Sequence, residues 1–392
     1  MKIGVLTGGG DCPGLNSVIY GLLLQAYDVG HEVVGIEKGW KGFLENITKP
    51  LNIAELDDLH TVGGTMLYTS RTNPFSDVVK IKDENERKEA EKRKAEELQS
   101  KMKELNIDIL VAIGGDDTLG VAAKIFKHTG AKVLGVPKTI DNDLAGTDYT
   151  FGFWSAVQLA SNNLDNLTTT AQSHQRVFVV EIMGRDAGWL TIASGISAGA
   201  DIILIPEIEF DFEKDIAQVL KNRAISGYKY HIIACAEGAV PSKESLDRDF
   251  KFITKEAIDQ CPKDPFGNPI LAKLNMSKII VKELTSREDI KKCFEEHDHE
   301  FEVRSVVLGH TMRAGTPNSF DRLQGLRLGM HTAELIEKNQ FGRMSVIRGD
   351  KIEDLPIVEG AKKKLIEKDS DIVKLRDLIV KVRYHSKQKM KK

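Results

Sequence analysis

Short apolar runs rich in valine and isoleucine recur along the chain, and turn residues bound each of them. Runs that are this short and apolar on both faces are typical of buried parallel strands. They predict strands at 2–7, 31–36, 108–113, 132–136, 176–182, 201–205 and 230–236. Stretches with helical spacing lie between them, for example at 16–27, 119–128 and 154–168. This alternation predicts an α/β protein with doubly wound, mostly parallel sheets.

The length of 392 residues favours more than one domain, since domains average roughly 150 residues. We expect two such sheet domains, with the active site in the cleft between them. The first spans 1–150 and is completed by about 312–365, and the second spans 151–311. Three segments depart from the pattern: a charged, solvated helix within 80–104, a polar insertion at 242–301, and a C-terminal helix with a basic tail at 366–392.

Composition and charge exclude several classes of protein. Lys and Arg number 55 and Asp and Glu 58, a net charge of −3, so a broad basic surface for nucleic acid is not expected. Four scattered cysteines (Cys12, Cys235, Cys261, Cys293) form no CxxC pair, which favours a reducing, cytoplasmic location. No apolar stretch reaches the roughly 18 residues of a membrane span, and the first ten residues leave no room for a signal peptide. We therefore expect a soluble cytoplasmic protein that binds neither nucleic acid nor a membrane.

The first candidate for chemistry is the glycine-rich stretch TGGGDCPGLN at 7–16, between a predicted strand and a predicted helix. Glycines there let backbone N–H groups approach a phosphate, and the helix N-terminus adds a positive end. A tight strand-to-helix turn without a ligand is the plainer interpretation. This motif alone does not decide between them.

Two further motifs place carboxylates after strands. In GGDDT at 114–118, Asp116 and Asp117 could hold Mg²⁺ beside a phosphate-binding loop, although one of them could instead N-cap the helix expected near Leu119. In PKTIDND at 137–143, an aspartate could take a hydroxyl proton while Lys138 stabilises a transferring phosphoryl group. An Asx-type loop with no chemistry is the alternative for the second motif.

A set of basic residues lies in or near glycine-containing segments: Arg71, Arg176, Arg185, Arg304, His310 and Arg313. A single Arg usually packs or is solvated, but several together favour clamping of phosphate groups. The motifs at Gly8, Gly114, Pro137, Met183 and Glu237 all follow predicted strands directly. Ligands of open α/β sheets bind outside the carboxyl ends of the strands. Because all of these motifs follow strands, the sequence predicts that they bind a ligand together at the carboxyl ends of the strands.

In this ordered set the sequence resembles the 6-phosphofructokinases, over Gly4 to Arg322. The matching motifs are GGGDCPGLN, GGTMLYTSR, GGDDT, PKTIDND, SHQR, MGRDAG, AEG and RSVVLGHTMRAGTP followed by DR. The resemblance implies transfer of a phosphoryl group to the 1-hydroxyl of fructose 6-phosphate, with Mg²⁺ as cofactor. It also implies a homo-oligomer, a dimer or a tetramer, whose active sites are shared between subunits.

The resemblance also implies a role for each matching position. Asp141 would be the base, acting with Lys138 and Asp117, and Asp116 would hold the Mg²⁺. Donor contacts are expected from Gly10, Arg71, Gly115 and Thr118. Sugar-phosphate contacts are expected from Thr139, Asp143, Met183, Gly184, Arg185, Glu237, His310 and Arg313. Arg176 and Arg304 would bind the 6-phosphate in the neighbouring subunit's site.

The donor is inferred from Asp117. ATP-dependent members of the family have Gly at that position, and pyrophosphate-dependent members resemble this chain in having Asp there and Lys at 138. A carboxylate near the α-phosphate of ATP would repel it by about 4 kcal/mol for unit charges 4 Å apart at an effective dielectric of 20. Pyrophosphate is thus the expected donor and ATP the alternative. A NAD or lipid kinase would lack the PKTIDND and MGR pair, and a non-catalytic sugar-phosphate sensor would not need Asp141.

Two other positions depart from the family. Tyr20 and Leu24 stand where regulated bacterial members carry effector-binding arginines, so regulation of that kind is not expected. Tyr68 stands where the family usually has Gly, three residues before Arg71. We therefore expect the loop that carries Arg71 to differ in shape from that of the family.

Overall fold

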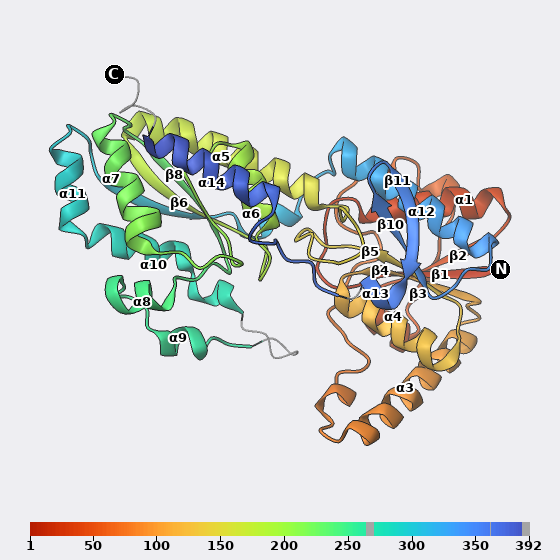
Figure 1. Ribbon diagram of the computed structural model, residues 1–392. Helices are drawn as coiled ribbons and strands as arrows, with labels where there is room; N and C mark the ends of the chain where they lie inside the picture. Colours follow the sequence, from red (N-terminus) through yellow and green to blue (C-terminus); the bar gives the residue numbers. More distant parts are fainter. Residues whose placement is uncertain (264–269, 361, 386–392) are drawn as a thin grey trace. The chain divides into compact units, whose positions relative to one another are not determined.

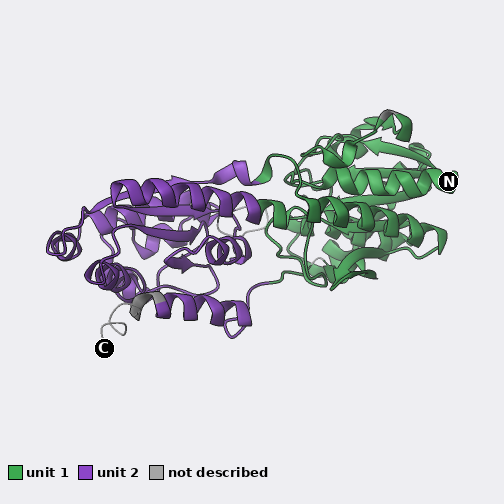
Figure 2. Cartoon of the chain, turned by 90° about the horizontal axis from the view of Figure 1, so that it is seen from above, with its two compact units in different colours: residues 1–156, 313–364 green, residues 157–312, 365–392 purple. Residues whose placement is uncertain are grey.

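The computed structural model describes residues 1–263, 270–360 and 362–385. The chain forms two compact units (Figure 2). Unit 1 comprises Met1–Ala156 and Arg313–Lys364, and unit 2 comprises Val157–Met312 and the chain from Leu365 onward. The chain therefore passes between the units after residues 156, 312 and 364. The C-terminal helix belongs to unit 2, and the basic tail at 386–392 lies outside the described residues.

Unit 1 is built on a sheet that has seven strands in the described part of the chain, in the order β11-β10-β5-β4-β1-β2-β3. Its strands are β1 (Lys2–Thr7), β2 (Glu32–Ile36), β3 (Thr48–Pro50), β4 (Ile109–Gly114), β5 (Val133–Pro137), β10 (Arg343–Arg348) and β11 (Lys351–Pro356). The inner pairs are parallel, and only the outermost strands β3 and β11 run antiparallel to their neighbours. The central strands are buried throughout, which explains their uninterrupted apolar sequences.

Helices cover both faces of this sheet (Figure 1): α1 and α12 lie on one face, and α4 with α3 and α13 on the other. The bounds are α1 (Leu15–Asp28), α2 (Gly39–Glu45), α3 (Glu84–Glu104), α4 (Asp116–Thr129), α12 (Ser319–Glu337) and α13 (Ile357–Gly360), with 3₁₀ turns at Ile53–Glu55, Leu59–Thr61 and Val78–Lys80. Helices α1 and α12 approach closely because Gly21 and Gly329 face each other's helix. A Cβ on Gly21 would lie 2.2 Å from the Leu326 carbonyl oxygen, and one on Gly329 2.1 Å from that of Val18.

Unit 2 is built on a smaller sheet, with four strands among the described residues, in the order β7-β8-β6-β9. Its strands are β6 (Arg176–Ile182), β7 (Ile202–Leu204), β8 (His231–Ala236) and β9 (Glu302–Val307). All of its strand pairs are parallel. The expected α/β fold with two mostly parallel sheets is therefore confirmed.

The helices of unit 2 are α5 (Phe153–His174, which begins in unit 1), α6 (Trp189–Ser197), α7 (Gln218–Ile225), α8 (Lys243–Asp249), α9 (Lys255–Asp259), α10 (Met276–Thr285), α11 (Glu288–Glu295) and α14 (Asp371–His385). A π-helical turn at Phe212–Ala217 precedes α7, and 3₁₀ turns lie at Leu271–Leu274 and Gly309–Arg313. The polar segment 242–301 does more than cover the sheet. Met276, Ile280, Leu284, Ile290 and Phe294 belong to the buried core of unit 2.

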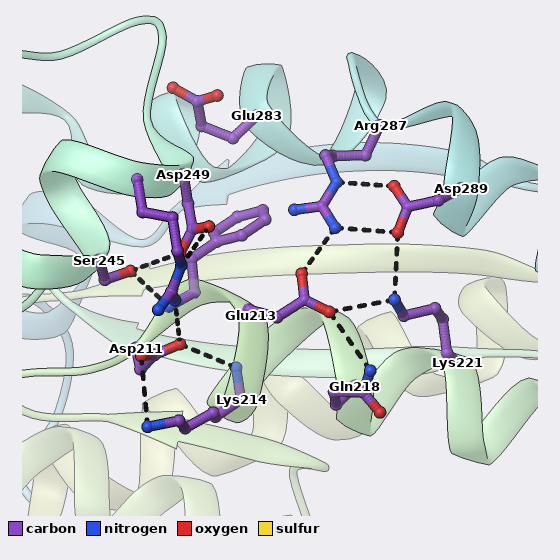
Figure 3. Close-up of polar contacts among 12 residues, drawn as sticks. Asp211, Glu213, Lys214, Gln218, Lys221, Ser245, Asp249, Glu283, Arg287 and Asp289 are labelled. Atoms are coloured by element: carbon purple, nitrogen blue, oxygen red, sulfur yellow. Dashed lines mark hydrogen bonds and ion pairs between the residues drawn. The ribbon is translucent and has the colours of Figure 1, made fainter.

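Charged side chains hold the start of α11 against the π-helical turn and α7 (Figure 3). Arg287 donates from Nη2 to Glu213 Oε2 (2.6 Å) and from Nε to Asp289 Oδ1 (2.7 Å), and Lys221 Nζ lies 3.1 Å from each carboxylate. The hydrogen bonds from Arg287 hold the pKa of Asp289 well below its ordinary value. Each of the four side chains contacts two side chains of the opposite charge, so the group acts as a network rather than as isolated surface pairs.

The elements expected from the sequence agree closely with the structure, apart from those with weak patterns. Strands β1 and β6 have the predicted bounds, and the other predicted strands differ by one residue at one or both ends. Strands β3, β9, β10 and β11 were not predicted: β3, β9 and β11 lie at sheet edges and carry charged residues, and the short apolar run of β10 stands between two arginines. Across the described residues, no helix combines the length and the apolarity that crossing a bilayer requires.

Candidate active site

Three candidate loops of unit 1 lie side by side because they follow neighbouring parallel strands. Strands β5, β4 and β1 are adjacent, so their carboxyl ends share one edge of the sheet. Gly8 N donates to Ile113 O at the end of β4 (2.9 Å), and Lys138 N donates to Gly114 O (2.9 Å). The structure thus brings together the motifs at 7–16, 114–118 and 137–143.

The Thr118 side chain occupies the space beside two of the glycines at this edge. A Cβ on Gly8 would lie 2.5 Å from Thr118 Oγ1, and one on Gly114 would lie 2.3 Å from Thr118 Cβ. The Thr118 side chain is buried between the two loops. Helix α4 begins at Asp116 and is preceded by Gly115 as N-cap, without a side-chain capping bond. The alternative that an aspartate caps a helix starting near Leu119 is therefore wrong. Asp116 and Asp117 lie in the first helical turn, where negative charge is favourable.

Two cations lie against the glycine-rich loop. Lys138, which is 4% exposed, donates from Nζ to Gly10 O, and Arg313 donates from Nη1 to Asp11 O (3.3 Å). A Cβ on Gly10 would lie 1.8 Å from Arg313 Nη1, so a side chain there would displace the guanidinium of Arg313. Burial lowers the pKa of Lys138 and raises the pKa of the Cys12 thiol beside it to about 12. Arg313, expected to contact the sugar phosphate, thus lies beside the loop expected to contact the donor.

Three carboxylates interact at the same edge. Burial, together with the negative charges of Asp141 and Asp116, raises the pKa of Asp143 to about 6. Asp141 is 5% exposed, and its backbone N–H donates to Thr139 Oγ1 (3.0 Å). Asp117 is exposed. The arrangement places carboxylate oxygens, the buried Lys138 and the partly buried Arg313 together within unit 1, the combination that a phosphate and a divalent metal require.

The carboxylates fit the Mg²⁺ ion that the sequence implies. Mg²⁺ prefers oxygen ligands and usually keeps several waters, binding through one or two carboxylates and the phosphates of its substrate. Among residues 1–263, 270–360 and 362–385 there is no group of three or more His, Cys, Asp or Glu side chains arranged to hold a metal by themselves. A site completed by water and donor phosphates matches that finding. Asp116 is suited to hold the ion, and so is Asp143, which the resemblance instead assigns to the sugar phosphate, because a cation would relieve their mutual repulsion.

Mg²⁺ should raise the melting temperature more at pH 8 than at pH 5.5. The raised pKa of Asp143, about 6 in the folded state against 3.8 ordinarily, means that its charge costs stability above pH 6 and that protonation relieves the cost below it. A metal at ten times its dissociation constant would add about 1.4 kcal/mol at pH 8. Thermal unfolding with and without Mg²⁺ measures this. An Asp143→Asn variant should lose the pH dependence, and an equal rise at both pH values in the unmutated chain would contradict the assignment.

The segment that carries Arg71 is tied to the glycine-rich loop. Gly9 N donates to Ser70 O (3.0 Å), and Thr69 Oγ1 donates to Gly9 O (2.6 Å). Arg71 itself is exposed. Tyr68 adopts a left-handed backbone conformation with φ of 57°, and its side chain is 60% exposed. That conformation is one that Gly adopts at no cost, which accounts for Gly at this place in the family.

In unit 2, Glu237 joins the loops that follow β6 and β8. Its Oε1 accepts from Gly184 N (3.3 Å) and from Arg185 N (2.9 Å). Arg185 has φ of 52° and an exposed side chain. Met183 is partly buried beside them, and His310 is exposed in the turn after β9, the neighbour of β6. These five predicted sugar-binding residues thus lie at the carboxyl ends of adjacent strands.

Arg176 and Arg304 lie elsewhere in unit 2. Arg176 begins β6, so it is roughly 20 Å along the strand from the loop after Ile182, at about 3.3 Å per residue. Arg176 pairs with Glu302 on β9, and Glu302 bridges it to Arg304: the Glu302 carboxylate accepts from Arg176 Nε and from Arg304 Nε (2.8 Å). Within unit 2, the two arginines do not join the predicted sugar-binding residues at the carboxyl ends of the strands. Glu302, which the sequence did not single out, holds them together.

Comparison with solved structures identifies the class of fold. The pyrophosphate-dependent phosphofructokinase of Nitrosospira multiformis superposes with a TM-score of 0.71 at 17% identity, covering 97% of this chain and 91% of its own. The phosphofructokinase of Saccharomyces cerevisiae superposes with a TM-score of 0.67 at 25% identity, over 98% of this chain and 48% of the yeast chain. The two-unit α/β architecture is therefore that of a phosphofructokinase.

The sequence leads to the same family. The model of the phosphofructokinase family matches residues 2–336, and the chain belongs to that family. The pyrophosphate–fructose 6-phosphate 1-phosphotransferase of Dictyoglomus thermophilum is 39% identical over 365 residues, 93% of this chain and 94% of its own. The ATP-dependent 6-phosphofructokinase 3 of Streptomyces coelicolor is also 39% identical, over 92% of this chain and 94% of its own. Similar relatives thus carry either donor in their names.

Proposed function

We propose that this protein is a Mg²⁺-dependent phosphotransferase that converts fructose 6-phosphate and pyrophosphate into fructose 1,6-bisphosphate and phosphate, in cytoplasmic glycolysis. The observation that carries the proposal is the edge of unit 1 where Lys138, Asp141 and Asp143 lie beside the glycine-rich loop. A buried cation and several carboxylates at one strand edge match the needs of phosphoryl transfer, in which positioning and charge stabilisation supply most of the catalysis.

Each group has a defined task in this proposal. Asp141 accepts the proton of the sugar's 1-hydroxyl as its oxygen attacks the phosphorus of the donor. Lys138 stabilises the negative charge on the phosphate that leaves. Bound Mg²⁺, held by Asp116 and Asp143, would supply further positive charge at the transferring group. Gly10, Gly115, Thr118 and Arg71 serve the donor, while Thr139 and Arg313 serve the sugar, as do Met183, Gly184, Arg185, Glu237 and His310 in unit 2.

The choice of pyrophosphate rests on Asp117. It lies exposed in the first turn of α4, directly after Asp116. A donor whose phosphates lie along this loop would place additional negative charge next to the Asp117 carboxylate if it extended as far as ATP does. Pyrophosphate is shorter, and Lys138 offers it a buried positive charge. With pyrophosphate as donor, we expect the reaction to be close enough to reversible to run in both directions.

An initial-rate assay tests the proposal directly. Purified protein is given fructose 6-phosphate and Mg²⁺ with either pyrophosphate or ATP, and fructose 1,6-bisphosphate is measured. We expect turnover with pyrophosphate well above that with ATP, and none without Mg²⁺. A strong preference for ATP would overturn the donor assignment while leaving the phosphotransferase in place. Absence of product with both donors would overturn the function itself.

We further propose that each active site of a homo-oligomer takes Arg176 and Arg304 from the neighbouring subunit. Their place at the opposite end of β6 from the Met183 loop supports this arrangement. Arg176→Ala chains and Asp141→Ser chains should each be inactive alone. Mixed oligomers should regain part of the activity, because some sites then combine an intact Asp141 with an intact Arg176. Denaturing and refolding the two variants together, followed by rate measurements on verified mixed oligomers, provides the test, and no recovery would contradict site sharing.

A further inference from the structure

The segment 362–366 follows the last residue matched by the family model, and the sequence did not single it out. The family model ends at residue 336, and the chain passes from unit 1 to unit 2 directly after Lys364. Contacts at each end of this short segment lead to two loops that carry proposed site residues.

On the side of unit 1, the segment pairs with the loop that carries Asp141 and Asp143. Lys363 forms an antiparallel bridge with Leu144. Ala145 N donates to Lys362 O (2.8 Å), and Lys364 N donates to Asp143 O (2.6 Å). The backbone of residues 143–145 is therefore held by an adjacent strand-like segment from a distant part of the sequence.

The Lys364 ammonium closes the same loop. Its Nζ donates to Asn142 Oδ1 (3.1 Å), Thr147 O (3.0 Å) and Asp148 O (3.0 Å), so each of its three donors has an acceptor. Asn142 has φ of 52°, and its Oδ1 also accepts from Thr150 N (3.1 Å). Lys364 thus joins the two ends of the loop through Asn142, which directly follows Asp141.

On the side of unit 2, the next anchor comes two residues later. Ile366 N donates to Glu207 Oε1 (3.1 Å). The same carboxylate accepts from Gly188 N, at 3.0 Å to Oε1 and 3.1 Å to Oε2. Gly188 ends the loop MGRDAG that carries Met183, Gly184 and Arg185. Burial raises the pKa of Glu207, and the backbone hydrogen bonds from Gly188 and Ile366 oppose this rise because they stabilise the carboxylate.

We propose that residues 364–366 form a connector that links the loop of Asp141 in unit 1 to the loop of Arg185 in unit 2, and that Lys364 is a positioning residue for Asp141 and Asp143. This inference rests on the proposed function for its effect on turnover. Only Leu365 separates the two anchors, and a single extended residue has little slack. A displacement of either loop is therefore transmitted to the other through the backbone of the connector.

The first test compares Lys364→Met with Lys362→Met. Both variants remove an ammonium from the same segment, but the Lys362 side chain is exposed while that of Lys364 is partly buried. We expect Lys364→Met to lower kcat by roughly tenfold or more, because a misplaced base loses much of its 10²–10⁴-fold contribution. Fructose 6-phosphate binding should change less than threefold. Lys362→Met should leave both unchanged, and equal kcat values in the two variants would overturn the positioning role.

The second test asks whether the two anchors act together. Glu207→Gln should also lower kcat, and in the double variant with Lys364→Met the two losses should not multiply, since both release the same connector. A double variant whose loss equals the product of the single losses would overturn the link. If Lys364→Met does not fold, Lys364→Gln, which keeps an amide donor, replaces it in both tests.

Hydrogen exchange tests the connector without relying on catalysis. Lys364→Met should speed amide exchange in residues 141–150 of unit 1 and also in 183–188 of unit 2, with no such change in Lys362→Met. Faster exchange confined to 141–150 would overturn the link between the loops. This measurement separates the two proposals. An unmutated protein without turnover would refute the proposed function, but the exchange rates would still show whether the connector links the two loops.

Discussion

Asp141→Ser should lower kcat by roughly 10²–10⁴-fold, which is the usual contribution of a positioned general base. The Asp141 carboxylate is 5% exposed and lies close enough to Asp143 for its charge to raise the pKa of that group. A base at this edge acts on the hydroxyl only while the sugar is in place, so its removal affects turnover rather than substrate affinity. Serine keeps a small polar side chain and removes the carboxylate.

Steady-state rates and fructose 6-phosphate binding should be measured on the same preparations. We expect binding within about threefold of the unmutated protein, since the base contributes mainly in the transition state. Asp165→Ser, at an exposed position on α5, provides the matched control and should leave kcat unchanged. Near-normal turnover in Asp141→Ser would remove Asp141 from the mechanism.

Asp117→Gly should raise the rate with ATP and lower the rate with pyrophosphate. The size of the change depends on how well water screens the carboxylate. For unit charges 4 Å apart, the repulsion is about 4 kcal/mol at an effective dielectric of 20 and about 1 kcal/mol in water, or factors of about a thousand and about five. Because Asp117 is exposed, we expect a gain for ATP nearer the lower value.

Two further variants test how charge and side-chain volume determine the choice of donor. Asp117→Asn removes the charge and keeps the volume, so it should give part of the ATP gain if repulsion dominates and none if steric exclusion dominates. Lys138→Gly should mainly damage the use of pyrophosphate, because its ammonium at the glycine-rich loop is the buried charge available to the leaving phosphate. An unmutated enzyme that strongly prefers ATP would refute the inference from Asp117.

Local patterns in the sequence were sufficient for the parts of the fold that are buried on both faces. The apolar runs of β1 and β6 predicted their bounds, because strands that are buried on both faces are apolar at most positions, although β6 also contains the buried Glu181. The motifs after β1, β4 and β5 were also placed at one edge of a sheet in advance. Parallel strands with right-handed crossovers leave only that position for their following loops.

The positions of edge strands and of helix starts could not be predicted from local patterns, because they depend on neighbouring parts of the fold. Strand β9 alternates charged and apolar residues and was taken for part of a basic motif, yet it completes the sheet beside β6. Helix α4 begins at Asp116 rather than near Leu119, because Gly115 serves as its N-cap and the aspartates supply negative charge to the first turn. The polar residues of 242–301 hid the apolar positions, such as Ile280 and Phe294, that place this segment in a core.

The sequence by itself determined the α/β class, the family and the identity of the candidate site residues, because these follow from short-range patterns and residue types. Only the tertiary structure decided which of these residues meet. It placed Arg313 against Asp11, Glu302 between Arg176 and Arg304, and Lys364 on the loop of Asp141. Arg313 and Asp11 are 302 positions apart, Arg176 and Glu302 are 126 apart, and Lys364 and Asn142 are 222 apart. Contacts over such separations arise from how strands and loops pack, and no local pattern of residues specifies them.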